Sequence, residues 1–288
     1  MQLYSITLIL SPSAKNITSI LSFYQEIICR KAFRICILFP VLLMAGKISV
    51  QGQSAKEVNT RYQTWFSLNT LSRLSNKWGV MADFHHVRRD NLVAKPRFYF
   101  IRVGTNYWIN DKVSLSLAYG HMWLAPSVDG WKNYSQENRI HEQFQVNSKL
   151  KKVSVVQRLR NEQRWQQIMV NDEPSGKLRF TNRVRYLASF NIPLFKNEYL
   201  PSMVMADEIM VQFGKDVIYN TFDQNRIFAG IRQKISRDIS FDFGYMRVFQ
   251  QKNTGYQYDL YHTFRLFFYY TPDFRKNFRQ THHHSGDE

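Results

Sequence analysis

The chain has 288 residues, enough for one large all-β domain or two ordinary domains. Its 39 basic and 22 acidic residues give a formal net charge of +17, which suits a nucleic-acid binder only if the basic side chains lie outside. The two cysteines, Cys29 and Cys36, lie near the N-terminus, which excludes a disulfide framework or a cysteine-based metal site in the rest of the chain.

An export signal is the first predicted element. Basic residues within 30–34 precede an apolar run at 35–46, and small residues follow at the positions that signal-peptide cleavage requires. The apolar run is too short to cross a bilayer as a helix, which needs about 20 residues. We therefore expect cleavage between Gly52 and Gln53, with residues 1–28 as an extension of no structural role. An uncleaved membrane anchor is the alternative.

Alternating runs of apolar and polar residues fill the chain after the export signal. In "KVSLSLAYGHMW" (112–123), Leu115 and Leu117 share one face of a strand while Ser114 and Ser116 share the other. Strict alternation over such lengths predicts β-strands with one apolar and one polar face. We expect strands at 61–72, 77–89, 97–109, 112–124, 137–149, 152–166, 177–192, 200–213, 224–235, 238–250 and 256–270.

Short and long connections alternate between these strands. Tight turns such as "SNK" (75–77) contrast with long polar loops such as "LAPSVDGWKNYSQ" (124–136) and "QIMVNDEPSG" (167–176). This alternation is typical of outer-membrane β-barrels. Since eleven strands cannot close a barrel whose neighbours are all antiparallel, we expect ten wall strands or twelve. The predicted organisation is an export segment at 1–52, an all-β transmembrane antiparallel barrel at 53–272 and a polar tail at 273–288.

A strand with one charged face is predicted within "VVQRLRNEQRWQQ" (155–167), where every second residue from 158 to 164 is charged. Each arginine facing lipid would cost about 2–4 kcal/mol near the bilayer midplane. Together with the arginines of the next strand, that cost exceeds the roughly 5–15 kcal/mol of typical net stability. We therefore expect the charged faces to line the interior as an ion-pair network. Its predicted members are Arg158, Arg160, Glu162, Arg164, Arg179, Arg183, Arg185, Glu208, Asp242 and Asp259.

The opposite faces of the strands, rich in Phe, Tyr, Val, Leu and Ile, are expected to contact lipid. Aromatic residues near strand ends suit a belt at the membrane interfaces. The predicted belt consists of Trp78, Trp108, Trp123, Trp165, Tyr269 and Tyr270. Four polar residues share the lipid face and do not fit it: Asn161, Gln163, Asn182 and His262. We expect the first two to lie where their strand projects beyond the bilayer, and Asn182 to lie near an interface.

Six segments resemble one known family. They are "TWFSLNTLSRLSNKWGVMADFHHVRRDN" (64–91), "RLRNEQRW" (158–165), "RVRYLASFNIPL" (183–194), "DEIMVQFG" (207–214), "FDQNRIFAGIRQKIS" (222–236) and "FDFGYMRVFQ" (241–250). In this order they are similar to the outer-membrane barrel family catalogued as domain of unknown function 2490 (DUF2490), over residues 60–272. The resemblance implies a β-barrel in the outer membrane of a Gram-negative cell. It implies no particular activity.

Three classes of function stay open. A narrow channel or binding barrel would favour small anionic solutes, because the predicted interior is rich in arginine. A structural or assembly component of the outer membrane would have a plugged lumen. A barrel enzyme acting on envelope lipids would need a nucleophile beside His85, His86 or His121, and no glycine-flanked serine accompanies them. We expect the first class, without catalysis.

The expected partners are outer-membrane lipid and a small anionic solute. Nucleic acid is not expected, because most arginines are assigned to the interior and no stacking platform follows them. No cofactor is expected. The histidines of "THHHS" (281–285) lie in the polar tail with no carboxylate geometry to complete a site, a poor basis for binding a metal. The sequence leaves the solute and the oligomeric state open.

Overall fold

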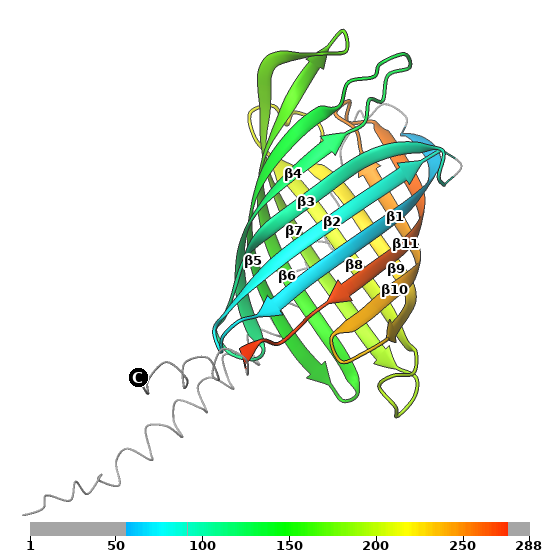
Figure 1. Ribbon diagram of the computed structural model, residues 1–288. Coiled ribbons are helices and arrows are strands. Elements are labelled where there is room, and N and C mark those ends of the chain that lie inside the picture. The colour runs from blue at the N-terminus through cyan, green and yellow to red at the C-terminus, as the bar shows by residue number, and fades with distance from the viewer. Residues whose placement is uncertain (1–55, 91, 276–288) are drawn as a thin grey trace, which may run out of the picture. The chain divides into compact units, whose positions relative to one another are not determined.

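A closed β-barrel makes up most of residues 56–90 and 92–275, the part of the chain that the computed structural model describes (Figure 1). Its strands are β1 Glu57–Arg73, β2 Trp78–Arg89, β3 Lys95–Trp108, β4 Val113–Leu124, β5 Ser135–Leu150, β6 Val153–Val170, β7 Glu173–Pro193, β8 Ser202–Phe213, β9 Phe222–Lys234, β10 Ile239–Gln251 and β11 Gln257–Tyr270. The prediction of a closed all-β barrel is confirmed. The expected export signal and the "THHHS" segment lie outside the described residues.

Residues of alternate parity turn into the barrel, as the pleat of a strand requires. In β4, Ser114 and Met122 are buried, whereas Leu117 lies exposed on the outer surface. Small inward residues on this strand leave room for large side chains on its neighbour. A Cβ atom on Gly120 would come within 2.7 Å of the Phe100 ring on β3. Within the described ranges, no helix is long and apolar enough to cross a membrane.

The barrel closes through one parallel pair of strands. β1 runs parallel to β11 over fourteen residue pairs, from Glu57 opposite Gln257 to Thr70 opposite Tyr270. Every other neighbouring pair is antiparallel. The expectation of ten or twelve strands in an all-antiparallel wall is therefore wrong. An odd number of strands is accommodated because a parallel ladder also satisfies the backbone N–H and C=O groups of both edges.

Strands β6 and β7 extend further than the sequence pattern predicts. The expected long loop at 167–176 is instead the end of a hairpin that projects beyond its neighbours at the top of Figure 1. Only Asn171 and Asp172 separate the two strands, and both have positive φ, 50° and 67°. Such a two-residue turn matches the twist of paired strands, and Asn and Asp are among the residues that tolerate it best. Polarity alone had suggested a loop there.

The same hairpin holds the neighbouring connection between β4 and β5. The Asp172 carboxylate accepts hydrogen bonds from the backbone N–H groups of Lys132, at 2.9 and 3.1 Å, and of Asn133, at 2.9 Å. The Asn133 side chain in turn donates to the carbonyl oxygen of Asp172 at 2.8 Å. The long connection at 125–134 is thus anchored at one end of the barrel.

The parallel seam predicts a specific cross-link. Cysteines placed at Leu68 and Phe268, which are opposite each other on the seam and face outward, should form a disulfide, because opposed Cα atoms lie within its reach of about 7 Å. A Leu68→Cys/Phe264→Cys control is offset by about 13 Å along the strand and should not cross-link. Both variants carry serine at Cys29 and Cys36. Oxidation followed by non-reducing electrophoresis checks this, and equal cross-linking of the two pairs would contradict the parallel register.

Candidate functional site

Strands β6 and β7 supply the centre of the charged interior. The pleat turns charged residues of both strands inward, and four of them are buried: Arg160, Glu162, Arg183 and Arg185. The register sets Glu162 opposite Arg183, but it also sets Arg160 opposite Arg185. Like charges at opposed positions repel each other. Carboxylates on these and the neighbouring strands therefore have to compensate the arginines.

Glu162 is the hub of this network, and its side chain has no solvent exposure. Arg183 donates to its Oε2 atom through Nε at 2.7 Å and also through Nη2. Arg185 donates through Nη1 to Oε1 at 2.6 Å. Three further basic groups lie 3.3 to 4.0 Å from the carboxylate: His141, Arg160 and Arg139. Charge-assisted hydrogen bonds of this kind offset the cost of removing the carboxylate from water.

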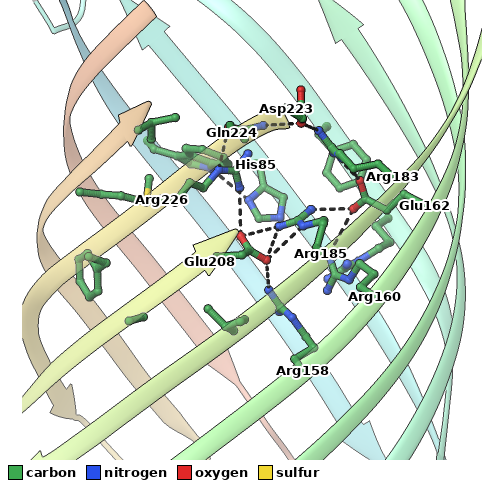
Figure 2. A pocket seen from close by; sticks show the side chains of 18 of the residues that line it. His85, Arg158, Arg160, Glu162, Arg183, Arg185, Glu208, Asp223, Gln224 and Arg226 are labelled. Carbon is green, nitrogen blue, oxygen red and sulfur yellow. Dashed lines mark hydrogen bonds and ion pairs between the residues drawn. The ribbon is translucent and has the colours of Figure 1, made fainter. Parts of the chain in front are cut away.

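Glu208 on β8 is a second centre, joined to the first by a shared arginine. Arg185 donates through Nη2 to both carboxylate oxygens of Glu208 at 2.8 Å, and Figure 2 shows it between Glu162 and Glu208. Arg158 of β6 donates to Glu208 at 2.8 Å, and Arg226 of β9 lies 3.6 Å from it. One connected set of ion pairs thus extends from β6 to β9.

Other buried carboxylates on the inner wall also bind arginine. The pairs are Glu137–Arg164 at 2.9 Å, Asp223–Arg183 at 2.8 Å, Asp242–Arg232 at 2.6 Å and Asp83–Arg102. Three of these pairs join strands that are neighbours in the barrel wall, whereas Asp223–Arg183 joins β9 to β7 across β8. A buried charge left without its partner destabilises a protein strongly, so this pairing allows so many charges to share one interior.

Arginine nevertheless outnumbers carboxylate in this interior. Twelve arginines and five carboxylates line one cavity, a surplus of seven positive charges that Asp83, just behind the lining, reduces to six. Seven of the arginines hydrogen-bond to a carboxylate. Among the described residues, the other five hydrogen-bond only to amide, carbonyl or hydroxyl oxygens: Arg97, Arg160, Arg179, Arg226 and Arg265.

The half of the interior built by β1, β3, β4, β10 and β11 is mainly apolar. Buried residues there form a cluster that includes Trp65, Phe98, Phe100, Met246 and Val248. The Trp65 ring meets Phe98 edge-on, with ring centroids 5.5 Å apart. Because the charged residues come mainly from β5 to β9, the interior has one ionic wall and one apolar wall.

The cavity between the two walls has a volume of about 800 Å³. Its lining includes Asn220 and Asn253, in the connections at the end where the hairpin projects. The lining also includes Ser240 and Thr271, at the end where the short turns lie. The cavity therefore reaches both ends of the barrel.

The structure places the ten residues of the expected charge network as follows. Nine of them line the cavity: Arg158, Arg160, Glu162, Arg164, Arg179, Arg183, Arg185, Glu208 and Asp242. Asp259 is also buried but lies outside the cavity lining, where it accepts a hydrogen bond from the Tyr261 hydroxyl at 3.1 Å. Lys252 and Arg61 lie 3.3 and 3.4 Å from its carboxylate.

The expected aromatic belt is wrong at two of its six positions. Tyr269 lines the cavity, and its hydroxyl donates to Asp242 at 3.1 Å. Trp108 has the parity of the buried Asn106, and the guanidinium of Arg73 lies 4.7 Å from its ring. Both residues turn inward because strand parity, and not side-chain type, decides the face. The other four have outward parity: Trp78 and Tyr270, which are exposed, and Trp123 and Trp165, which are partly buried.

Several inward arginines escape the sequence prediction. Arg97, Arg102 and Arg265 lie in the segments "RFYFIR" (97–102) and "FRLFFYY" (264–270), where aromatic residues occupy both faces. Such runs hide the polar parity that identifies β6 and β7. Phe98, Phe100 and Arg102 are spaced two residues apart and therefore share one face of the strand. That spacing is the signal that could have identified Arg102 as facing inward.

Three of the four misfit polar residues on the outer face are hydrogen-bonded to neighbours. Asn161 and Gln163 donate to the Glu142 carboxylate at 3.2 and 3.4 Å. His262 lies 2.6 Å from the Tyr245 hydroxyl and stacks on Tyr62. Asn182 shares the outward parity of its strand. Hydrogen bonding between neighbours lowers the cost of placing polar groups on a wall that is otherwise apolar.

His85 and His86 both contact aromatic side chains. His85 faces inward and accepts a hydrogen bond from Trp65 Nε1 at 3.2 Å. Ser67 is opposite His85 in the register, but it is fully buried and its Oγ atom has no hydrogen-bond partner among the described residues. Asp83 is held by Arg102. His86 stacks on Tyr99 on the outer face. The described residues also hold no cluster of three or more potential metal ligands.

Removing the hub carboxylate should destabilise the barrel. Glu162→Gln would leave Arg183 and Arg185 buried with less compensation, which typically costs about 3–5 kcal/mol of the free energy of unfolding. Glu142→Gln is the matched control, because Glu142 lies on the neighbouring strand but faces outward. We expect the control to change stability by less than about 1 kcal/mol. Urea unfolding followed by tryptophan fluorescence checks this, and similar losses in both variants would contradict the assigned role of Glu162.

A comparison with known proteins identifies the family of the chain. A family model described as "Protein of unknown function (DUF2490)" matches residues 62–259, from β1 into β11. No curated protein and no solved structure is significantly similar to the chain. The matched segment includes the whole ionic wall. The chain belongs to the DUF2490 family.

Proposed function

We propose that the barrel spans the outer membrane of a Gram-negative cell and that its interior binds small anionic solutes and lets them pass slowly, without catalysis. The membrane part rests on the outer wall. Large apolar side chains there are exposed in the middle of the strands, among them Val103 at 56%, Leu117 at 57% and Leu159 at 49%. Water penalises an apolar surface of this extent, whereas lipid accommodates it.

The interior supports the second part of the proposal. One observation carries it: twelve arginines and five carboxylates line a cavity whose lining reaches both ends of the barrel. A narrow space with surplus positive charge and low-dielectric walls attracts anions and repels cations. An anion could accept hydrogen bonds from the five arginines that have no hydrogen bond to a carboxylate. Such binding would break none of the arginine–carboxylate hydrogen bonds of the network.

The width of the interior argues against bulk flow. Open aqueous porins use 16–18 strands, and a small barrel is filled by its own side chains. Arg226 of β9 lies over the Trp65 ring of β1 at 4.7 Å, and β1 and β9 are not neighbours in the wall. This contact favours a second candidate function, a structural barrel with a filled lumen.

Conductance distinguishes passage from a filled lumen. In a planar bilayer with a potassium chloride gradient, we expect a small current whose reversal potential shows preference for chloride, because positive side chains dominate the cavity. Arg160→Gln/Arg226→Gln should lower the chloride preference by roughly twofold or more. Lys149→Gln, at an exposed position, should leave it unchanged. The absence of current at any potential would rule out passage of ions through the barrel. A preference for potassium would contradict both anion passage and anion binding.

Membrane insertion has an independent test. A nitroxide attached at Leu117→Cys, on the outer face of β4, should collide more often with oxygen than with a water-soluble nickel chelate, because oxygen concentrates in lipid. The same label at Asp129→Cys, in the exposed 125–134 connection, should show the reverse order. Electron paramagnetic resonance of proteoliposomes measures both. Greater accessibility of Leu117 to the nickel chelate would be incompatible with a lipid-facing wall.

A further inference from the structure

One wall of the cavity is charged and the other is apolar, and this difference limits which ligands the cavity can bind. Charged side chains of β5 to β9 form one wall. The other wall carries Phe98, Phe100, Met246 and Val248, which no anion alone would contact favourably. The inference below rests on the proposed anion-binding function and names the class of anion.

Three arginines lie where the two walls meet. The guanidinium of Arg226 is 4.7 Å from the Trp65 ring, and that of Arg97 is 3.9 Å from the Tyr261 ring. Arg265 lies between two rings, those of Phe228 and Phe267, at 4.0 Å from each centroid. None of the three arginines hydrogen-bonds to a carboxylate in the described part of the chain, although Arg226 lies 3.6 Å from Glu208 and Arg265 lies 3.5 Å from Asp242, acids that other arginines share. Each therefore presents positive charge directly beside an apolar surface.

One of these arginines, Arg265, also retains hydrogen-bonding capacity. The Nε atom of Arg265 is buried and has no hydrogen-bond partner among the described residues, and the same holds for Arg158 on the ionic wall. A buried donor without a partner carries a free-energy cost. A ligand oxygen that accepts from such a donor removes the cost, so the cavity has built-in sites for an anionic group.

We propose that the ligand is an amphiphilic organic anion: a carboxylate, sulfonate or phosphate monoester attached to an aromatic or short alkyl group. The anionic group would bind among Arg226, Arg265 and the ionic wall. The apolar group would lie on Phe98, Phe100 and Met246. The volume of about 800 Å³ falls in the range of small-molecule pockets, which combine apolar linings with a few placed polar groups.

The anionic group of such a ligand binds the arginines, and its apolar group contacts the apolar wall. An inorganic anion satisfies the arginines but leaves the apolar wall against water, with no gain from its burial. A neutral apolar molecule covers that wall but leaves the surplus positive charge without a counterion. Only a molecule that carries both groups on one skeleton meets both demands.

The test compares three small probes on the whole barrel in lipid nanodiscs, with empty nanodiscs as the blank. Benzoate has both groups, acetate lacks the ring, and benzamide lacks the charge. Calorimetric titration should give a dissociation constant for benzoate at least about tenfold lower than for acetate or benzamide. Equal affinities for benzoate and acetate would overturn the amphiphile while leaving anion binding intact. Equal affinities for benzoate and benzamide, or no binding of either anion, would overturn both proposals.

Variants assign the two halves of the ligand to the two walls. Arg226→Gln removes a charge and should weaken benzoate and acetate alike. Met246→Gln keeps the side-chain length and should weaken benzoate about tenfold with little effect on acetate. Lys149→Gln, outside the cavity, should change neither. Heat-dependent electrophoretic mobility shows that each variant still forms a barrel, and an unchanged benzoate affinity in both cavity variants would overturn the assignment to this cavity.

Discussion

Pairing of buried guanidinium groups with carboxylates is the interaction on which the rest of the barrel depends. If the barrel spans a membrane, as proposed, arginines that face lipid would cost more than a protein of this size can spare. Turning them inward, with acids beside them, avoids that cost. Glu162 and Glu208 fulfil that role, since Arg185 joins both into one network. Once the charges are inside, strand parity leaves the apolar residues outside. The apolar outer wall and the ionic interior therefore both result from the alternation of apolar and polar residues along the strands.

The sequence predicts most of this arrangement where one face of a strand is uniformly polar. On β6 and β7, charged residues recur at period two, and both the strands and the inward direction of Glu162 follow from that period alone. Prediction fails where the period is obscured. Aromatic residues on both faces conceal the inward direction of Arg102 and Tyr269. The parallel seam and the β6–β7 hairpin depend on pairing between strands, which residue alternation does not encode.

The interior is more than a salt-bridged core, because its charges do not balance. If the lumen served rigidity alone, each arginine would be expected to have its own acid, as pairing without surplus gives the lowest cost of burial. Instead, Arg226 and Arg265 share the acids Glu208 and Asp242 with other arginines, and both of them, like Arg97, rest against aromatic rings. Cation–π contact stabilises these guanidiniums without neutralising them. The barrel thereby keeps positive charge next to an apolar surface, and that combination sets its interior apart from a water-filled pore.

The parallel contact between β1 and β11 has a consequence for how the barrel is assembled and engineered. Its partners are 200 residues apart in sequence, from Glu57 with Gln257 onward, so no short turn can nucleate it and its closure carries the largest loop entropy of any strand pair. Parallel order also leaves the beginning of β1 and the end of β11 on opposite rims. Circular permutation through a short linker is therefore ruled out, and reporter domains fused at Glu57 and Tyr270 would lie at opposite ends of the barrel.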